Sequence, residues 1–459
     1  MSGDRGELAL VLHTHMPYVE GFGTWPFGEE WLWEALATSY LPLLDVLDRG
    51  APLTLSVTPV LADQLEAEGV GPRFLRFLHD VRRETHRLDA DGLRAGGEPL
   101  LGAEVQRAGA DYERAAERFE ARGGDVVGAL ARHAAWTSAA THAVLPLVAT
   151  EAGLRLQVET GVAAHRRRFG AWAGGFWLPE CAHGPWLDPE LERAGVHAAC
   201  VELTDVFGLG SERHLRPLRS PAGPLLVPID RAIVGLVWGA DGYPSHGRYR
   251  DYHHHTIHHH RPWGNDGAPY DHAAAMALAR EHAADFVARV RERVAGGGLC
   301  VCAVDTELLG HWWYEGVAWL ETVLDEAVGQ GLALTRLDDA LARHEPAPAP
   351  TLPVTSWGTP RDLSTWSAPA VADLAWGARD AELRVVAAGP KASERALREL
   401  LAVQSSDWAF MVARGLAAPY GRERHREHAA GVRRAIGGEL ESRVRNLAPD
   451  LSPASALQP

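Results

Sequence analysis

Short apolar runs alternate with longer amphipathic stretches along most of this 459-residue chain. The apolar runs cover residues 8–13, 53–59, 175–180, 197–203, 233–238, 299–305 and 332–337. The stretches between them include patterns with helical periodicity, such as residues 29–49 and 272–294. Because strands that alternate with helices pair in parallel, this order predicts an α/β fold with each apolar run as a strand.

The run Leu299–Asp305, LCVCAVD, is apolar on both faces until its last residue. That pattern is typical of a strand covered on both sides, as in the inner ring of an α/β barrel. Chemistry in such barrels takes place at the carboxyl ends of the strands, where Asp305 and Glu180 are both expected. Two carboxylates among aromatic residues suit the cleavage of glycosidic bonds. The alternative for either acid is a capping or salt-bridged residue at a strand end.

Three further segments suggest how the chain is divided. Residues 69–135 are charged and rich in Ala, Arg and Glu, which predicts a helical insertion or a long helical crossover. Residues 344–354 are rich in Pro and Ala and are expected to be a linker. We therefore expect a catalytic domain over residues 1–343 and a smaller helical domain over residues 355–459.

The formal charge of −15 argues against nucleic acid or an anionic membrane surface as a partner. No stretch approaches the roughly 18 apolar residues of a membrane span, and the first residues do not resemble a signal peptide. We expect a cytoplasmic monomer that binds a neutral or cationic ligand. Cys181, Cys200, Cys300 and Cys302 lack the spacing of zinc ligands or secreted disulfides, so reduced, buried thiols are expected.

The chain has 16 tryptophans, several of them in clusters. An indole ring offers a broad apolar face that stacks well on the flat face of a sugar. The alternative for any single tryptophan is ordinary packing in the core.

Six segments carry a resemblance to glycoside hydrolase family 57. GFWLPECAH and VDTELLGHWWYEG resemble the family's third and fourth motifs, the second in the form found in α-1,4-glucan branching enzymes. LVLHTHMPYV and AATHAVLPLV are similar to the first and second motifs, and TSWGTPRDLSTW and SSDWAFMVARG to segments of the branching-enzyme group. The resemblance runs from His13 to about His428. It implies a distorted seven-stranded β/α barrel with a helical insertion and a C-terminal all-α domain, and no cofactor or metal.

The resemblance also implies roles for individual residues. Glu180 matches the family's nucleophile and Asp305 its general acid/base. His13 and His15 would line the subsite of the cleaved sugar; a metal pair or two core histidines are the alternatives. His142 matches the second-motif histidine, and its alternative is a hydrogen-bonded helix histidine near the core.

Other residues are expected to contact the glucan. His311 and Trp312 would form the wall beside Asp305. Trp357, Trp366 and Asp407 would complete the acceptor side of the groove from the C-terminal domain. Trp263 is a further candidate for substrate binding.

A loop after residue 238 departs from the family pattern. By resemblance, Tyr243 in DGYP is the lid tyrosine that shields the intermediate from water, but YPSHG replaces the usual YPGD. The cluster His253–His260 follows, and either a metal-binding tract or a solvated loop would explain it. Leu309 stands where the family has phenylalanine. These departures leave the balance between transfer and hydrolysis open.

The resemblance predicts a retaining 1,4-α-glucan branching enzyme that acts on an α-1,4-glucan. An α-glucan hydrolase or a 4-α-glucanotransferase on the same scaffold is the main alternative. A non-catalytic glucan-binding protein and a metal-dependent deacetylase are further alternatives.

Overall fold

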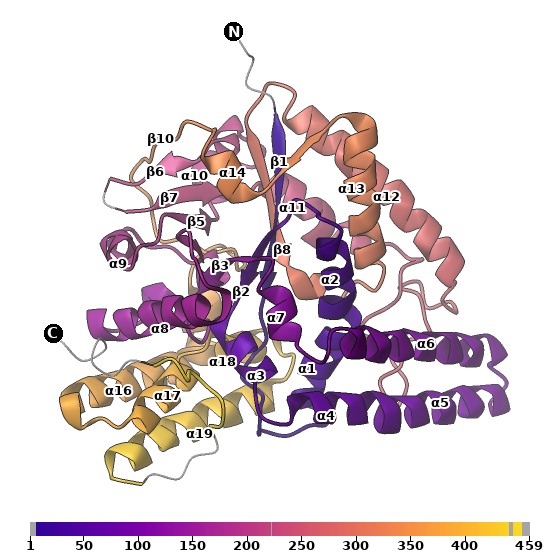
Figure 1. The fold of residues 1–459 in the computed structure, drawn as a ribbon, viewed down its shortest axis with the longest axis horizontal. Coiled ribbons are helices and arrows are strands. Elements are labelled where there is room, and N and C mark those ends of the chain that lie inside the picture. The colour runs from indigo at the N-terminus through magenta and orange to yellow at the C-terminus, as the bar shows by residue number, and fades with distance from the viewer. Residues whose placement is uncertain (1–5, 222, 440–443, 452–459) are drawn as a thin grey trace.

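A single curled sheet of ten strands forms the centre of the computed structural model, which describes residues 6–221, 223–439 and 444–451 (Figure 1). The strands are β1 (Glu7–Thr14), β2 (Thr54–Val57), β3 (Ala134–Ser138), β4 (Gly175–Trp177), β5 (Ala198–Val201), β6 (Leu218–Arg219), β7 (Leu225–Pro228), β8 (Leu299–Asp305), β9 (Ala333–Thr335) and β10 (Ala347–Pro348). Seven of them lie side by side in parallel, in the order β7-β5-β4-β3-β2-β1-β8. The expected α/β fold class is confirmed.

The remaining three strands are short additions to this parallel array. β9 pairs with β1, β6 runs antiparallel to β7, and β10 pairs with β6. Between the two ends of the parallel array, the backbone N–H of Asp230 donates a hydrogen bond to the carbonyl of Val301 over 2.8 Å. Helix α11 (Arg231–Trp238) follows Asp230 and packs against β8.

The prediction of a strand over residues 233–238 is wrong, because these residues form most of α11. The Asp230 carboxylate accepts hydrogen bonds from the backbone N–H groups of Ala232 and Ile233, at 3.1 and 3.4 Å, and so caps the helix. The strand nearest this point in the chain is β7, which begins eight residues before the predicted run, at Leu225. A short apolar run cannot be assigned to helix or strand from periodicity alone.

The other six predicted runs each contain a strand, but four strands were not predicted. β3 lies at the end of the segment assigned to helices, and β6, β7 and β10 have two to four residues each. Strands this short carry too few residues for a pattern of alternation.

Helices cover both faces of the sheet (Figure 1). Those of the barrel are α1 (Glu29–Ala35), α2 (Leu41–Asp48), α3 (Pro59–Leu65), α8 (Glu151–Phe169), α9 (Asp188–Arg193), α10 (Thr204–Phe207), α12 (His272–Arg293), α13 (Gly316–Gln330) and α14 (Leu337–Leu341). The segment between β2 and β3 adds α4 (Val70–Arg76), α5 (Arg83–Ala95), α6 (Pro99–Ala121) and α7 (Val126–Leu130). The long pair α5 and α6 extends to one side of the barrel.

The C-terminal region is helical and packs beneath the carboxyl end of the sheet, next to α8 (Figure 1). Its helices are α15 (Ser364–Ser367), α16 (Ala372–Ala388), α17 (Glu394–Val403), α18 (Ser406–Arg414) and α19 (Ala418–Ile436). Their apolar side chains share a core with Tyr18, which follows β1, and Val60 on α3. The expected linker at residues 344–354 contains β10, so it lies along the sheet. The division into domains stays a prediction.

The four cysteines are buried free thiols. Among the described residues, no helix combines the length and apolar character that crossing a bilayer requires.

Candidate active site

A row of polar side chains crosses three neighbouring strands where they end. The register pairs His13 of β1 with Ser56 of β2 on one side and with Asp305 of β8 on the other. Nδ1 of His13 lies 3.2 Å from the hydroxyl of Ser56. Parallel strands present their carboxyl ends on the same edge of the sheet, so residues separated by hundreds of positions meet there.

His13 belongs to a chain of hydrogen bonds that leads to Glu180. Its Nε2 lies 2.9 Å from Nε2 of His142, whose Nδ1 lies 2.9 Å from the hydroxyl of Ser406. The hydroxyl of Ser406 bonds in turn to the carboxylate of Glu180, which also lies 3.7 Å from Nδ1 of His142. With both imidazoles neutral, every group can donate to the next, from Ser56 to the carboxylate. The chain therefore directs N–H and O–H groups toward Glu180.

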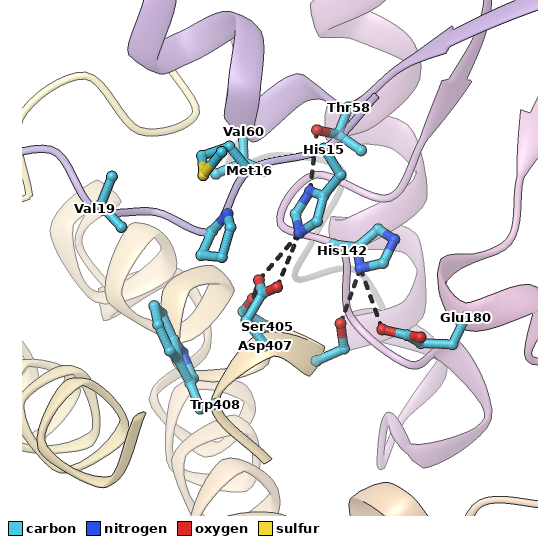
Figure 2. Close-up of polar contacts among 12 residues, drawn as sticks. His15, Met16, Val19, Thr58, Val60, His142, Glu180, Ser405, Asp407 and Trp408 are labelled. Carbon is cyan, nitrogen blue, oxygen red and sulfur yellow. Dashed lines mark hydrogen bonds and ion pairs between the residues drawn. The ribbon is translucent and has the colours of Figure 1, made fainter. Parts of the chain in front are cut away.

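His15 makes a separate contact with the C-terminal region. Its Nε2 lies 3.0 Å from a carboxylate oxygen of Asp407 in the first turn of α18, and its Nδ1 lies 3.2 Å from the hydroxyl of Thr58 (Figure 2). Ser405 donates a second hydrogen bond to Asp407. The rings of His15 and His142 stack with centroids 4.0 Å apart. This stacking places the His15–Asp407 contact beside the chain of hydrogen bonds that ends on Glu180.

Glu180 follows β4 and has a left-handed backbone, with φ 62° and ψ 20°. Its neighbour Cys181 and the site histidine His142 also have positive φ, at 47° and 59°. Such backbones are uncommon outside glycine and cluster at functional sites, where the surroundings hold them. Here Trp357 holds Glu180 by donating its backbone N–H to the carbonyl (2.9 Å) and its indole N–H to the carboxylate (3.0 Å).

Trp357 is itself fixed by residues that the sequence did not indicate. Arg231, the first residue of α11, donates a hydrogen bond to the carbonyl of Trp357 over 3.3 Å. Its Nε donates to the carboxylate of Glu202, which is 1% exposed at the end of β5. Because residues 233–238 were assigned to a strand, the sequence did not predict the helix that begins at Arg231, and no signal placed Arg231 at the site.

The two candidate catalytic carboxyls have different electrostatic surroundings. Burial raises the pKa of Glu180, and hydrogen bonds from Trp357 and Ser406 partly oppose that rise. The pKa of Asp305 lies well above its usual range, because of burial first and then the charges of Glu307 and Glu180. Among the described residues no hydrogen bond to the side chain of Asp305 opposes this rise. Of the two carboxyls, Asp305 is therefore the one whose surroundings more strongly favour the protonated form.

The three histidines also differ. Burial alone would lower the pKa of His15, but the charge and hydrogen bond of Asp407, together with the charges of Glu307 and Glu180, raise it. Burial and the nearby charge of His15 hold the pKa values of His13 and His142 well below their usual range. Of the three histidines, His15 is therefore the one whose surroundings favour the charged form, and those of His13 and His142 favour the neutral form.

Glu307 is a further buried carboxyl at the site. Only its position two residues after Asp305 in the sequence could have indicated it. Its carboxylate accepts hydrogen bonds from the hydroxyl of Tyr40 (2.5 Å) and the backbone N–H of His15 (3.0 Å). Burial raises its pKa to about 7 against these hydrogen bonds. Below the site, the ring of Trp177 stacks on His13 with centroids 4.5 Å apart and meets Trp357 edge to face.

Two family models match parts of this chain. Residues 135–353 match the model of glycosyl hydrolase family 57, and residues 378–444 match the model of the 1,4-alpha-glucan branching enzyme C-terminal region. A probable 1,4-alpha-glucan branching enzyme of Mycobacterium tuberculosis is 33% identical, over 97% of this chain and 94% of its own length. The chain belongs to glycosyl hydrolase family 57.

Two archaeal proteins are also similar to this family 57 chain. The 1,4-alpha-glucan branching enzyme of Thermococcus kodakarensis is 30% identical over 95% of this chain and 74% of its own length. The crystal structure of a GH57-type branching enzyme from Pyrococcus horikoshii superposes with a TM-score of 0.88 at 28% identity, covering 99% of this chain and 97% of that one.

The other residues of this family 57 protein that are predicted to bind substrate lie on two loops and in the core. His311 and Trp312 are on the loop that follows Asp305, and the backbone N–H of Trp312 donates to the carbonyl of Glu307 over 3.0 Å. Trp263 stacks on His254 in the loop after α11, with centroids 3.8 Å apart. Trp366 is only 2% exposed and packs in the main core. Their roles in substrate binding stay predictions.

Tyr243 contacts helix α12 in this structure. Its hydroxyl donates to Asp285 over 2.6 Å and its ring stacks on His282, both on α12. A lid role for Tyr243 would require these contacts to break, and it stays a prediction.

The histidine cluster of this family 57 protein is tied to the helical insertion. Nδ1 of His258 lies 2.6 Å from the carboxylate of Asp89 on α5, and the ring of His260 contacts that of His86 at a tilt of 39°, with centroids 3.8 Å apart. Across the described residues, no group of three or more His, Cys, Asp or Glu side chains converges as a metal site would require.

Proposed function

We propose that this protein is a 1,4-α-glucan branching enzyme that acts by a retaining mechanism. The observation that carries the proposal is the contribution of the C-terminal region to the site. The segment that matches the branching-enzyme C-terminal model supplies Ser406, which contacts His142, and Asp407, which contacts His15. The similarity to named branching enzymes extends along nearly the whole chain.

In the first half of the reaction, Glu180 is the nucleophile. A carboxylate oxygen of Glu180 attacks the anomeric carbon, the bond from that carbon to the 4-oxygen breaks, and Asp305 gives its proton to the leaving oxygen. The donor chain is then held as a glycosyl-enzyme. The different surroundings of the two carboxyls support this assignment, because Glu180 accepts hydrogen bonds that favour its charged form and Asp305 does not.

In the second half, the same groups act in reverse. Asp305, now a carboxylate, takes the proton from a 6-hydroxyl of an acceptor chain as that oxygen attacks the anomeric carbon. The bond to Glu180 breaks, and an α-1,6 branch results. Water competes for the same intermediate, so exclusion of water decides between branching and hydrolysis.

The histidines hold the sugar at the point of cleavage. Both ring nitrogens of each histidine already have partners, those of His13 and His142 in the chain that ends on Glu180 and those of His15 with Thr58 and Asp407. A sugar hydroxyl would therefore replace one of these partners, as donor or acceptor. Since the hydrogen-bond chain ends on Glu180, it also orients the nucleophile. A neutral polyhydroxyl substrate such as an α-1,4-glucan suits this lining.

One assay tests the proposal and separates it from its alternatives. Linear amylose is incubated with the protein, and reducing ends are counted before and after treatment with an α-1,6-specific debranching enzyme. A large rise only after debranching is expected. Reducing ends that appear beforehand without a further rise would identify a hydrolase, and redistributed linear chains a 4-α-glucanotransferase. The variant Glu180→Gln serves as the inactive control. If the wild type is as inactive as this control but still binds amylose, the protein is a glucan-binding protein.

A further inference from the structure

A hollow lies between the helical insertion and two loops, on the side of the barrel that carries Asp305. The hollow is open to solvent, and its volume of about 420 Å³ includes that open space. The residues around it come from α1 and the turn after it, α6, the loop after α11 and the loop after Asp305. They are Glu34, Thr38, Asp111, Tyr112, Arg250, Asp251, Tyr252, Arg261, Gly310, His311, Trp312 and Tyr314.

We propose that this hollow is a subsite for glucose units of the leaving and acceptor chains, with Trp312 as its stacking face and Arg261 as its main hydrogen-bond donor. The inference rests on the proposed branching activity and extends it, since neither Arg261 nor the hollow has a role in the assignments above.

Trp312 supplies an aromatic face on a rigid support. Its ring is 37% exposed, whereas the adjacent Trp313 is 1% exposed and anchors the loop in the core. Trp238, at the end of α11, is 39% exposed and meets Trp312 edge to face with centroids 5.5 Å apart. Two half-exposed indoles in contact form an apolar corner beside the hollow, as the flat face of a sugar requires.

Arg261 supplies donors that no protein group uses. Its Nε donates to the carbonyl of Tyr252 over 2.9 Å, and the guanidinium lies 4.3 Å from the centre of the Tyr252 ring. Among the described residues, the two terminal nitrogens of Arg261 have no hydrogen-bond acceptor, and Arg261 is one of the residues that line the hollow. A planar guanidinium held in this way can donate to two neighbouring hydroxyls of one sugar.

The charges of the lining favour a neutral ligand. Three acids and two arginines line the hollow. All three acids are already held, Glu34 by Tyr112 (2.7 Å), Asp111 by Tyr314 (2.6 Å) and Asp251 by the backbone N–H of His253 (2.7 Å). Burial, with Arg261, lowers the pKa of His311 to about 4, so this imidazole is neutral. A nearly balanced set of fixed donors and acceptors suits hydroxyl groups rather than an ion.

The position of the hollow assigns it to one side of the cleaved bond. The loop that carries Trp312 begins at Asp305, and the Trp312 N–H bonds the carbonyl of Glu307. The acid/base protonates the oxygen of the leaving chain, and the acceptor later enters on the same side. Glu180, which holds the donor, follows β4, and β4 is separated from β8 by β3, β2 and β1. The hollow is therefore on the acceptor side.

The test compares Arg261→Ala and Trp312→Ala with Trp376→Ala, which removes an indole that is 67% exposed on α16, away from the hollow. Two quantities are measured: the ratio of new branches to hydrolytic reducing ends from amylose, and the dissociation constant for maltoheptaose in a Glu180→Gln background. In the two hollow variants we expect the ratio to fall about tenfold and the dissociation constant to rise about tenfold, equivalent to one hydrogen-bonded or stacked contact. Trp376→Ala should change neither.

The outcomes separate the subsite from the proposed function. A folding defect lowers branching and hydrolysis together, leaves their ratio unchanged and counts against the subsite. If both hollow variants keep the wild-type ratio and affinity, the subsite is wrong while branching stands. If the wild type makes no branches, branching is wrong, and maltoheptaose affinity alone then decides whether the hollow binds glucan.

Discussion

The indole N–H of Trp357 donates to the carboxylate of Glu180 over 3.0 Å, although the two residues are 177 positions apart in the sequence. The backbone N–H of the same tryptophan donates to the carbonyl of Glu180 over 2.9 Å. One residue therefore fixes both the left-handed backbone of Glu180 and the direction of its carboxylate.

Trp357→Phe should move the acidic limb of kcat/KM to higher pH. The indole hydrogen bond lowers the pKa of Glu180, so its loss raises that pKa, and the ionised nucleophile then forms only at higher pH. A hydrogen bond to a charged group contributes about 1.5–3 kcal/mol, which corresponds to a shift of about one to two pH units. The control is Trp172→Phe, which removes an indole N–H that bonds the carbonyl of Gly175. An unshifted limb in Trp357→Phe would contradict the assignment of Glu180.

Asp305→Asn should abolish turnover and stabilise the fold at neutral pH. Because the folded pKa of Asp305 is raised, the folded state binds its proton more tightly than the unfolded chain does. Wild-type stability therefore falls as pH rises above the unfolded pKa of about 3.9, and asparagine carries no such cost. Melting temperatures should be higher for Asp305→Asn at pH 7, with a difference that narrows toward pH 3. A variant that melts below the wild type at pH 7 would overturn this expectation.

Asp407→Asn should remove the positive charge from His15 at neutral pH. The charge and hydrogen bond of Asp407 raise the pKa of His15 against its burial. A raised histidine pKa adds stability that is fully present below the unfolded pKa of about 6.5 and is lost as pH rises through the folded value. Denaturant unfolding should therefore show a larger loss for Asp407→Asn at pH 6 than at pH 9. Equal losses at both pH values would mean that His15 is neutral in the wild type.

Arg231→Met should lower both stability and kcat. It leaves the carboxylate of Glu202 buried without its arginine, and breaking a buried ion pair by removing one partner costs about 3–5 kcal/mol. It also frees the carbonyl of Trp357, so kcat should fall about tenfold with KM little changed, as for a loss of positioning. The double variant Arg231→Met/Glu202→Gln should recover most of the stability but not the kcat. Recovery of both would show that Arg231 acts only through the stability of the fold.

Local patterns in the sequence were sufficient for much of the fold. The apolar run that ends at Asp305 became β8, and the run that ends at Glu180 contains β4, because a buried parallel strand needs side chains that are apolar on both faces. The motif resemblance placed both carboxylates and the three histidines in one site, where the structure also has them. Periodicity failed over residues 233–238, where helix and strand patterns coincide and the cap at Asp230 decided for helix.

The sequence by itself therefore determined which segments are buried and which of them end in residues with ionisable or hydrogen-bonding side chains. These properties depend on residues that are neighbours in the chain. Only the tertiary structure decided which of those residues meet. The register of β1 places His13 beside Ser56 and Asp305, the C-terminal helices bring Ser406 to His142, and α11 brings Arg231 to Trp357. Each of these contacts joins segments whose separation in the sequence leaves no periodic or local signal, and each exists because packing the helices against the sheet buries apolar surface elsewhere.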